Sequence, residues 1–443
     1  MTAVVVALLS ACGTSPDGQV STAPGPSGTV APSGPARLVH VPADAPTITA
    51  GLALATPGSV VLVSAGTYRE SVTVTTPDVT LRGESRDGVV IDGEGLRSNG
   101  VQVVADGVRV ENLTVVNHTF NGVLVTGMHD GATAEAHNMD GYTRLDPERY
   151  PPLQRFEVSH VTARNNGLYG IYAFNTNNGV IADSYASGAA DSGFYVGQCA
   201  RCRILVTGNV AENNAIGYEN ANASDSVLIT GNRFSGNRVG LTLLSWYQEA
   251  YLPQHGDTVV GNVISDNVSA TSPSQADGGF GIGVGLSGAQ GNLLVRNRIT
   301  GNPVAGVQLT NTEDIASSDN SFVDNHLADN GLDAVDVSAA RTPSSGMCFS
   351  DPKALTILPE SLATRCPHGS PESAGVAGDR LPQVTAPEGM SFLQVPAGPA
   401  QPDLPGDLTA LPGPLPAVPG FPEVDDVPLP AADLLAERAA TAG

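Results

Sequence analysis

The sequence has little positive charge. Of its 443 residues, 21 are Lys or Arg and 44 are Asp or Glu, which gives a formal net charge of −23. The phosphate backbone of a nucleic acid and an anionic membrane surface would both repel such a chain. This imbalance excludes nucleic acid as a partner. The one contact with a membrane that we predict is through an N-terminal lipid anchor.

No apolar run in the sequence is long enough to cross a bilayer, which needs about 20 residues. The apolar stretch 1–12, MTAVVVALLSAC, ends in Leu-Ser-Ala-Cys. That ending resembles a bacterial lipobox, in which the Cys, here Cys12, carries the lipid of the mature protein. A signal peptide normally begins with basic residues, and none precedes Val4. A misassigned start codon, or an ordinary cleaved or truncated signal, is therefore the alternative. We expect an extracytoplasmic protein, either lipid-anchored or secreted.

Cysteines are few, and their positions support export. Besides Cys12 there are four, Cys199, Cys202, Cys348 and Cys366. In an oxidising compartment they predict two disulfides, Cys199–Cys202 and Cys348–Cys366. A Cys-x-x-Cys is also found in redox and zinc sites, but zinc would need further ligands nearby, so a short structural disulfide is favoured.

Composition divides the rest of the chain into three parts. Residues 13–37 are mostly Gly, Ser, Thr, Pro and other small residues, which is typical of a flexible tether. Residues 367–443 are Pro-rich and are expected to be extended or largely disordered. The folded body is therefore predicted to be residues 38–366, as a monomer.

A repeat runs through this body. Two positions five residues apart, usually both Asn, recur along the chain, and from His160 onward the pairs lie 23 to 35 residues apart. The pairs are Asn112/Asn117, His160/Asn165, Asp183/Gly188, Asn209/Asn214, Asn232/Asn237, Asn262/Asn267, Asn297/Asn302 and Asn320/Asn325. A period in the low twenties, stretched by insertions, predicts an all-β fold, a single-stranded right-handed parallel β-helix.

The Asn pairs have a structural interpretation. Asn tolerates the left-handed backbone conformation that the corners of each coil require. Stacked Asn side chains can also donate and accept hydrogen bonds from one coil to the next. We therefore predict corner residues and not ligands. Ahead of the first coils, the stretch 41–63 predicts a short helix that caps the open end of the stack.

The opening of the body also resembles a known family. Residues 47–72 read TITAGLALATPGSVVLVSAGTYRESV, which is similar to the start of pectin-lyase-like β-helix proteins, including pectin methylesterases. The later coils resemble a β-helix repeat family that includes the nitrous-oxide-reductase maturation proteins. The resemblance covers roughly 38–340 and implies the fold. It implies no single function, because proteins with this fold include lyases, hydrolases, esterases, epimerases and adhesins.

The catalytic motifs of the pectinases do not carry over to this sequence. The segment 191–197, DSGFYVG, is similar to the Asp-Phe-x-Phe-Gly strand of pectin methylesterases only with extra residues inserted. Their Gly-Arg-Pro-Trp element is missing from the sequence, as are the motifs of polygalacturonases and pectate lyases. No standard pectinase activity is therefore predicted.

The strand register provides a separate prediction of a site. Strands of the form Gly-apolar-x-apolar follow the corners, and the residue at x points outward when its neighbours point inward. The predicted outward column is Leu124, Tyr172, Tyr195, Glu219 and Thr242. Its exposed aromatic rings would stack on sugar rings, and the alternative is that these tyrosines simply favour strands.

Two long insertions are predicted to wall this column into a cleft. Residues 127–155 follow the strand of Leu124, and residues 245–257 follow the strand of Thr242. Long loops in compact folds are often functional. We therefore predict that His129, Trp246 and His255 contact the substrate together with Tyr172 and Tyr195.

The first insertion also contains candidate metal ligands. His129, Asp130, His137 and Asp140 could bind a divalent cation. Their spacing fits no standard metal motif, so solvated loop residues are the favoured interpretation, and no metal or cofactor is predicted.

Function is predicted from these residues together. Asp191 and Glu219 are candidate acid and base, and Arg238 borders them, as in a polysaccharide lyase or glycoside hydrolase. The leading hypothesis is a cell-surface protein that binds an extracellular polysaccharide, with or without cleaving it. The alternatives are a non-catalytic envelope, adhesion or assembly protein, and a metal-delivery protein, for which no Met- or His-rich tract is found.

Overall fold

The computed structural model describes residues 34–131, 133–134, 137–138 and 141–440. Cys12, the predicted signal 1–12 and most of the predicted tether 13–37 lie outside these residues. In the described part of the chain, no helix is long and apolar enough to span a membrane.

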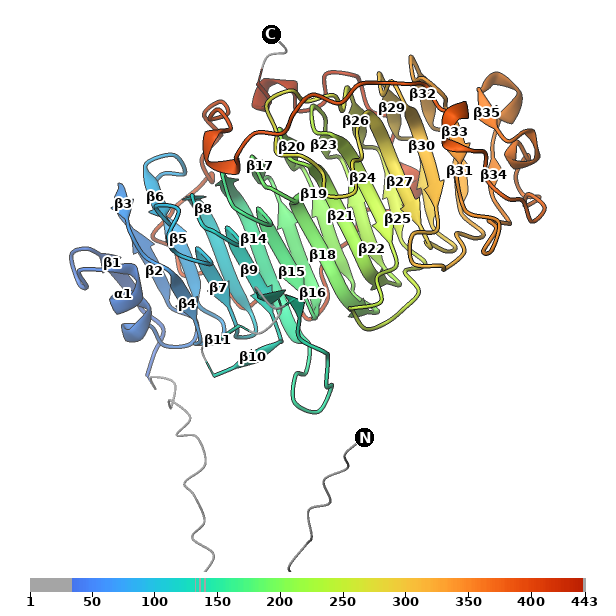
Figure 1. The fold of residues 1–443 in the computed structure, drawn as a ribbon. Coiled ribbons are helices and arrows are strands. Elements are labelled where there is room, and N and C mark those ends of the chain that lie inside the picture. Colours follow the sequence, from blue (N-terminus) through green and yellow to red (C-terminus); the bar gives the residue numbers. More distant parts are fainter. Residues whose placement is uncertain (1–33, 132, 135–136, 139–140, 441–443) are drawn as a thin grey trace, which may run out of the picture. The chain divides into compact units, whose positions relative to one another are not determined.

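The coils begin where the sequence predicts. Strand β1 (Leu38–Val41) pairs in parallel with β2 (Val60–Val63). Helix α1 (Ile48–Leu54) lies between them in sequence, and its first turn is capped by the Thr47 side chain, which accepts a hydrogen bond from Ala50 N at 3.1 Å. Ile48 is fully buried in the core, so this helix closes the end of the stack as predicted (Figure 1).

Each coil adds strands to two large parallel sheets. The first sheet contains eleven strands, which are β4 (Val72–Val74), β7 (Val101–Val103), β9 (Val123–Thr126), β15 (Ile171–Phe174), β18 (Ser192–Ala200), β21 (Ile216–Ser224), β24 (Val239–Leu244), β27 (Ile282–Ser287), β30 (Ala305–Thr310), β33 (Ala334–Asp336) and β35 (Ile357–Leu358). Consecutive strands in it are also neighbours in space, one coil apart. The predicted parallel β-helix is therefore confirmed.

The second sheet contains twenty strands and forms the other sides of the coils. Besides β1 and β2 it comprises β3 (Gly66–Tyr68), β5 (Thr80–Gly83), β6 (Val89–Asp92), β8 (Val108–Val116), β14 (Leu153–Arg164), β16 (Thr176–Ala182), β17 (Tyr185–Ser187), β19 (Ile204–Thr207), β20 (Val210–Glu212), β22 (Val227–Thr230), β23 (Arg233–Phe234), β25 (Thr258–Val260), β26 (Val263–Ser265), β28 (Leu293–Val295), β29 (Arg298–Thr300), β31 (Ser321–Val323), β32 (His326–Ala328) and β34 (Cys348–Phe349). Two short hairpins in the first insertion are β10 (His129–Asp130) with β11 (Thr133–Ala134), and β12 (His137–Asn138) with β13 (Gly141–Tyr142).

The space between the sheets is filled by one continuous apolar core. Buried Val, Ile, Leu and Phe side chains line it from Val39 in the first coil to Leu362 beyond the last strand. Aromatic rings stack from coil to coil inside it, as between Phe322 and Phe349, whose centroids are 4.8 Å apart. Because strand side chains alternate, the residues between these core positions face outward.

Stacked asparagines form two ladders in the later coils. The Nδ2 atom of one Asn donates to the Oδ1 atom of the next at 2.9 to 3.4 Å. The first ladder is Asn209, Asn232, Asn262, Asn297 and Asn325, and the second is Asn214, Asn237, Asn267, Asn302 and Asn330. The predicted coil-to-coil hydrogen bonding is confirmed.

Two details of the Asn prediction are wrong. Asn320 is not paired with Asn325 as a corner, because it belongs to a third column, where Asn292 Nδ2 donates to its Oδ1 at 2.8 Å. In the ladders, the left-handed conformation is adopted not by the Asn but by the residue before it, such as Gly231, whose φ is 65°. Among the asparagines of the predicted pairs, only those of the early coils take it themselves, as Asn112 does with φ of 56°.

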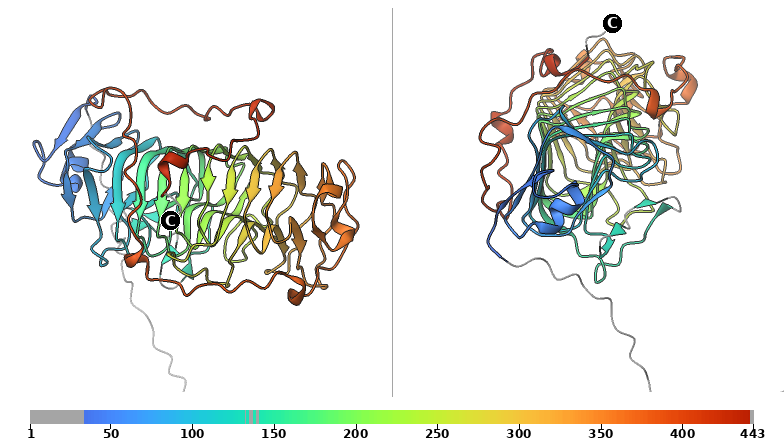
Figure 2. Two further views of the ribbon diagram at one scale, coloured as in Figure 1. Left: turned by 90° about the horizontal axis from the view of Figure 1, so that it is seen from above. Right: turned by 90° about the vertical axis from the view of Figure 1, so that its left-hand side faces the viewer.

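The segment 367–440 takes the extended form, which is one of the two forms expected for the Pro-rich tail. It runs along the outside of the coils, as the red trace in Figure 2 shows. Arginines of the coils donate to its backbone carbonyls, from Arg82 Nη1 to Leu408 O at 2.9 Å and from Arg298 Nε to Pro430 O at 3.0 Å. Prolines lack the N–H that a sheet needs, but their carbonyls still accept hydrogen bonds, so side chains and not strands hold this segment.

The remaining regular elements are short 3-10 helices near the C-terminus. They are η1 (Pro352–Ala354), η2 (Glu360–Leu362), η3 (Gly378–Arg380), η4 (Phe392–Gln394), η5 (Val424–Asp426) and η6 (Ala436–Arg438).

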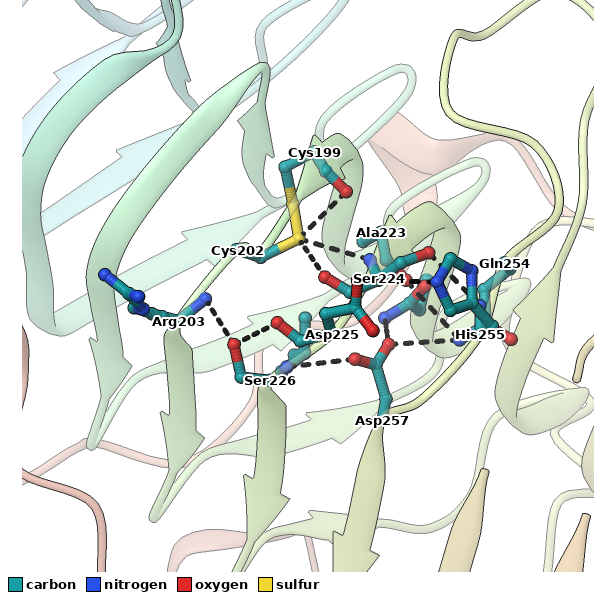
Figure 3. Close-up of a disulfide and its surroundings, with 12 residues drawn as sticks. Cys199, Cys202, Arg203, Ala223, Ser224, Asp225, Ser226, Gln254, His255 and Asp257 are labelled. Carbon is teal, nitrogen blue, oxygen red and sulfur yellow. Dashed lines mark hydrogen bonds and ion pairs between the residues drawn. A yellow bond between two sulfur atoms is a disulfide. The ribbon is translucent and has the colours of Figure 1, made fainter. Parts of the chain in front are cut away.

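Both predicted disulfides are present. Cys199 and Cys202 are joined, as are Cys348 and Cys366. In Figure 3 the first of them lies at a corner, where Cys202 Sγ is 3.2 Å from the backbone nitrogen of Ser224 in the next coil. Both cysteines of this pair are buried, in keeping with the structural role favoured by the sequence.

Candidate active-site cleft

The outer face of the eleven-stranded sheet has the predicted register. Tyr172 is paired with Leu124 on one side and with Tyr195 on the other, and Glu219 lies between Tyr195 and Thr242. Sequence spacing therefore placed all five side chains correctly in one column. Beyond Thr242 the column continues with Gly285 and Gln308.

The two tyrosines of this column are not exposed, which corrects the predicted aromatic stripe. Tyr172 and Tyr195 are 0% and 1% exposed. Tyr169 covers both, with ring centroids 4.5 Å from each, and Met128 and Tyr150 of the first insertion pack in the same cluster. Both rings point out of the core, but the first insertion then buries their apolar surface. Tyr172 therefore holds the insertion in place and does not contact a ligand.

A cleft of about 550 Å³ lies over the next coils of the same face. Its floor is the outward column from Tyr195 and Glu219 through Thr242 to Gln308, and an apolar strip of Ile216, Val239 and Ile282 flanks that column. Gly285 has no side chain above the floor, which adds depth at the middle of the cleft. The cleft therefore follows the stacking direction of the coils.

Two loops and the turn after β30 wall the cleft. One wall is the second insertion, as predicted, with Trp246 and Gln248 lining the cleft. The other wall is the loop between β26 and β27, with Gln275 and Asp277, which the sequence prediction missed. The signal for it is the spacing of 35 residues between Asn262 and Asn297, the longest among the pairs from His160 onward.

Two carboxyl groups meet at the end of the cleft near Tyr195. Ser192 Oγ lies 3.0 Å from Asp191 Oδ1 and 2.6 Å from Glu219 Oε2. One hydroxyl has one proton, so it can donate to only one of these oxygens at full strength. The second contact is satisfied when the Glu219 carboxyl is protonated and donates to Ser192 Oγ, while Ser192 donates to Asp191.

The pKa values of the pair agree with this proton arrangement. Burial and, after it, the charge of Asp191 raise the pKa of Glu219 well above its ordinary value. Burial also raises the pKa of Asp191, to about 6, although hydrogen bonds from Ser192 and Glu219 lower it. The directions of the two pKa shifts therefore agree with the hydrogen bonds, and both favour one proton shared by the pair and held by Glu219.

A third carboxyl group lies behind the pair. The Tyr195 hydroxyl donates a hydrogen bond to Glu249, which is 3% exposed. The Glu249 charge further raises the pKa of Glu219. The buried tyrosine thus serves the site indirectly, by holding a carboxyl group that keeps Glu219 protonated.

Besides Tyr172, three predicted site residues do not reach the cleft, namely Arg238, His129 and His255. Arg238 is 3% exposed, and its Nε donates to Ser272 Oγ at 3.0 Å beneath the ring of Phe280. The corner before β24 turns this side chain under the loop between β26 and β27. Its predicted place beside the carboxyl groups is therefore wrong.

The two histidines also make contacts elsewhere. His129 Nδ1 lies 2.8 Å from the carbonyl oxygen of Gly131, within the first insertion. His255 Nδ1 lies 2.7 Å from the carbonyl oxygen of Pro253, and Nε2 is 3.4 Å from Asp225 beside the first disulfide (Figure 3). The insertions leave the sheet at the predicted edge, but their local turns direct both rings away from the cleft.

The candidate metal ligands of the first insertion are only partly described. Asp130 forms an ion pair with Arg149 at 3.6 Å, which already balances its charge. The His137 side chain and Asp140 lie outside the described residues. Among the residues that are described, no three His, Cys, Asp or Glu side chains are grouped as a metal site would require.

Charge in the cleft has one sign. Its lining includes Asp191, Glu219, Asp277 and Glu313, and the described lining residues include no Lys, Arg or His. The four predicted residues that do line it are Asp191, Tyr195, Glu219 and Trp246. The cleft thus combines a proton-sharing carboxyl pair, one indole ring and neutral polar side chains on its floor.

Comparisons with known proteins identify the fold. A family described as "Right handed beta helix region" matches residues 78–254. The chain therefore contains a right-handed β-helix region, which confirms the predicted handedness. No curated protein matches the chain.

The chain also has a distant similarity to solved structures that include an epimerase and two lyases. The A-module of a mannuronan C-5 epimerase from Azotobacter vinelandii is 17% identical over 66% of this chain and 81% of its own, with a TM-score of 0.43. The pectate lyase Pel9A is 13% identical over 65% and 70%, with a TM-score of 0.37. A mannuronic-acid-specific family 6 lyase from human gut microbiota is 13% identical over 61% and 70%, with a TM-score of 0.38. These similarities are distant in both sequence and structure.

Proposed function

We propose that this chain is a glycan-binding β-helix protein that hydrolyses a glycosidic bond in its cleft. The observation that carries the proposal is the Asp191–Ser192–Glu219 unit, in which two carboxyl groups share one proton on the cleft floor. Glycosidases use one protonated and one ionised carboxyl group on either side of the scissile bond.

The two carboxyl groups have distinct roles in this proposal. Glu219, which holds the shared proton in this arrangement, donates it to the leaving glycosidic oxygen as the carbon–oxygen bond breaks. Asp191, with a pKa of about 6, is ionised, and its carboxylate bonds to the anomeric carbon as the leaving group departs, which gives a glycosyl ester. Water then hydrolyses this ester while the Glu219 carboxylate takes the proton of the water, which returns both groups to their starting states. Since both oxygens contact one hydroxyl, they are closer than the roughly 6.5–9.5 Å of inverting enzymes, which favours retention of configuration.

Hydrolysis fits the cleft better than β-elimination. An elimination must stabilise extra negative charge beside the uronate carboxylate, and basic side chains are one means of doing so. The described lining residues offer carboxyl groups and amides instead. Protonation of a leaving oxygen needs no such cation.

The test of this proposal is turnover of polysaccharides by paired variants. Wild type should release reducing ends from a glycan that it binds, and Glu219→Gln should lower that rate by about 10²–10⁴-fold while binding is kept. Asp191→Asn should have a similar effect, and Glu372→Gln, an exposed residue outside the cleft, should have none. Equal rates for Glu219→Gln and wild type would refute the assignment.

A second candidate is a non-catalytic surface or adhesion protein. It is favoured by the burial of Glu219, which is only 8% exposed and hydrogen-bonded to Ser192, as a purely structural carboxyl group would be. This alternative predicts glycan binding that continues without any release of reducing ends. Turnover by wild type would exclude it.

Export is part of the proposal. The two disulfides support an oxidising compartment, and the Leu-Ser-Ala-Cys ending of residues 1–12 supports lipidation at Cys12. Mass spectrometry of the mature N-terminus should find a lipid-modified Cys12, and a Cys12→Ser variant should lose membrane association. An unmodified N-terminus at another residue would end this part of the proposal.

A further inference from the structure

The cleft carries unbalanced negative charge along its whole length. Asp191 and Glu219 lie at one end, Asp277 on the wall between β26 and β27, and Glu313 just beyond β30. Among the ion pairs of the described residues, none involves any of these four carboxyl groups. Glu219 holds a proton, so three formal charges face the space where a ligand would lie.

The spacing of these groups suits a polymer and not a single ion. Adjacent coils are about 4.8 Å apart, so the floor from Tyr195 to Gln308 extends over several sugar units. The carboxyl groups of Asp277 and Glu313 come from separate loops beyond the catalytic pair. A chain with positive charge on successive units would meet them one after another.

An aromatic ring is held on the wall formed by the second insertion, across the cleft floor from the Asp277 loop. Trp246 lines the cleft, and its backbone is fixed by Asn222, which accepts from Trp246 N at 2.8 Å and donates to Trp246 O at 2.7 Å. An indole face attracts the apolar face of a sugar and also a nearby ammonium group. The wall therefore combines stacking with the attraction of a cation.

We infer that the cleft takes a polymer of amino sugars with free ammonium groups. The inference rests on the proposed function of the cleft as a glycan site, and it names the substrate class. A polyuronate would bring a carboxylate on each unit against Asp191, Asp277 and Glu313, with no basic side chain in the described lining to balance them. An N-acetylated amino sugar would fit the space but gain nothing from these charges.

The experiment compares three hexasaccharides by isothermal titration with the full chain. The probes are a β-1,4-linked glucosamine hexamer, the same hexamer fully N-acetylated, and a galacturonate hexamer, titrated into the Glu219→Gln variant to prevent turnover. The glucosamine hexamer should bind at least tenfold more tightly than the N-acetylated one, and its affinity should fall as salt increases. The galacturonate hexamer should bind most weakly.

Variants of the two wall carboxyl groups test whether Asp277 and Glu313 cause the tighter binding of the glucosamine hexamer. Asp277→Asn and Glu313→Gln should each weaken binding of the glucosamine hexamer by roughly two- to fivefold, as expected for exposed charge pairs. Binding of the N-acetylated hexamer should stay unchanged in both, and Glu372→Gln should change neither.

The outcomes separate this inference from the proposed function. Equal affinity for the two amino-sugar hexamers, or tighter binding of the galacturonate hexamer, would overturn the substrate class while the cleft remained a glycan site. Binding of none of the three, with no polysaccharide hydrolysed by wild type, would overturn both.

Discussion

Removal of the Asn232 side chain should lower the free energy of unfolding by about 4 kcal/mol. Asn232 is fully buried in the middle of the first ladder. Its Oδ1 accepts from both N and Nδ2 of Asn209 at 3.0 Å, and its Nδ2 donates to Val206 O and to Asn262 Oδ1 at 2.9 Å. Each of these contacts joins Asn232 to a neighbouring coil.

The magnitude follows from the groups that Asn232→Ala would leave without partners. The backbone N–H of Asn209 and the carbonyl of Val206 would remain buried, with no side chain to pair with and an apolar core beside them. An unsatisfied buried polar group costs about 1–3 kcal/mol, so two of them give the stated value.

Equilibrium urea unfolding, followed by fluorescence of Trp246, measures this effect. Trp246 is the one tryptophan in the sequence and lies two residues after the end of β24, in the coil that also contains Asn232. The control is Asn325→Ala at the far end of the same ladder, where the residue is half-buried and water can replace its hydrogen bonds. A loss for Asn232→Ala no greater than for Asn325→Ala would refute the stabilising role of the ladder.

Three further predictions concern other parts of the chain. Burial raises the pKa of Asp257 to about 8, so the folded protein holds this proton more tightly than the unfolded chain, whose Asp pKa is about 3.9. Its contribution to stability should therefore be complete below pH 4 and be lost as the pH rises to 8, at up to about 1.4 kcal/mol per pH unit. Asp257→Asn should flatten this dependence in urea unfolding at pH 5 and pH 8, and an unchanged slope would contradict the assignment. Arg438 donates to Gly208 O at 2.7 Å and to Asp183 O at 2.9 Å, so Arg438→Ala should speed hydrogen exchange in residues 399–440 at least tenfold while the coils stay protected. Equal exchange would show that the tail is held by other contacts. The Cys348–Cys366 disulfide closes a loop with a sequence separation of 18, against 3 for Cys199–Cys202. Its double Ser variant should lose about 3 kcal/mol in urea unfolding, more than the other double variant, and the reverse order would contradict a chain-entropy effect.

The fold could be predicted because its repeat is local. Corner residues recur at each turn of the chain, and the strand after each corner has fixed alternation, so spacing alone gave the column from Leu124 to Thr242. The error at Asn320 has the same origin. Asn320, Asn325 and Asn330 follow one another at intervals of five residues, and they belong to three different columns, so spacing could not tell which two formed the expected pair.

The candidate site could be predicted only in part. Alternation gives the direction of a side chain and not what covers it, and so Tyr195 points outward yet is buried under Tyr169. Arg238 and His255 lie at corners or in loops, where no period fixes direction. The carboxyl pair depended on Ser192, whose importance arises from a contact between neighbouring coils that the sequence does not display.

Alternation also separates the residues of a strand that pack in the core from those that face the cleft. Glu219 lies between Tyr218 and Asn220, both fully buried, and these inward neighbours meet the demands of the core. The outward position has no such role, so its charge can change while the coil keeps its packing. A shared β-helix therefore carries little information about substrate, because the fold depends on one set of alternate residues and the cleft on the other. In the acidic lining of this cleft, Glu219 belongs to the second set, and Asp191, Asp277 and Glu313 come from corners and loops outside the strands, so the chemistry of the cleft has to be derived from its own residues and not from the fold.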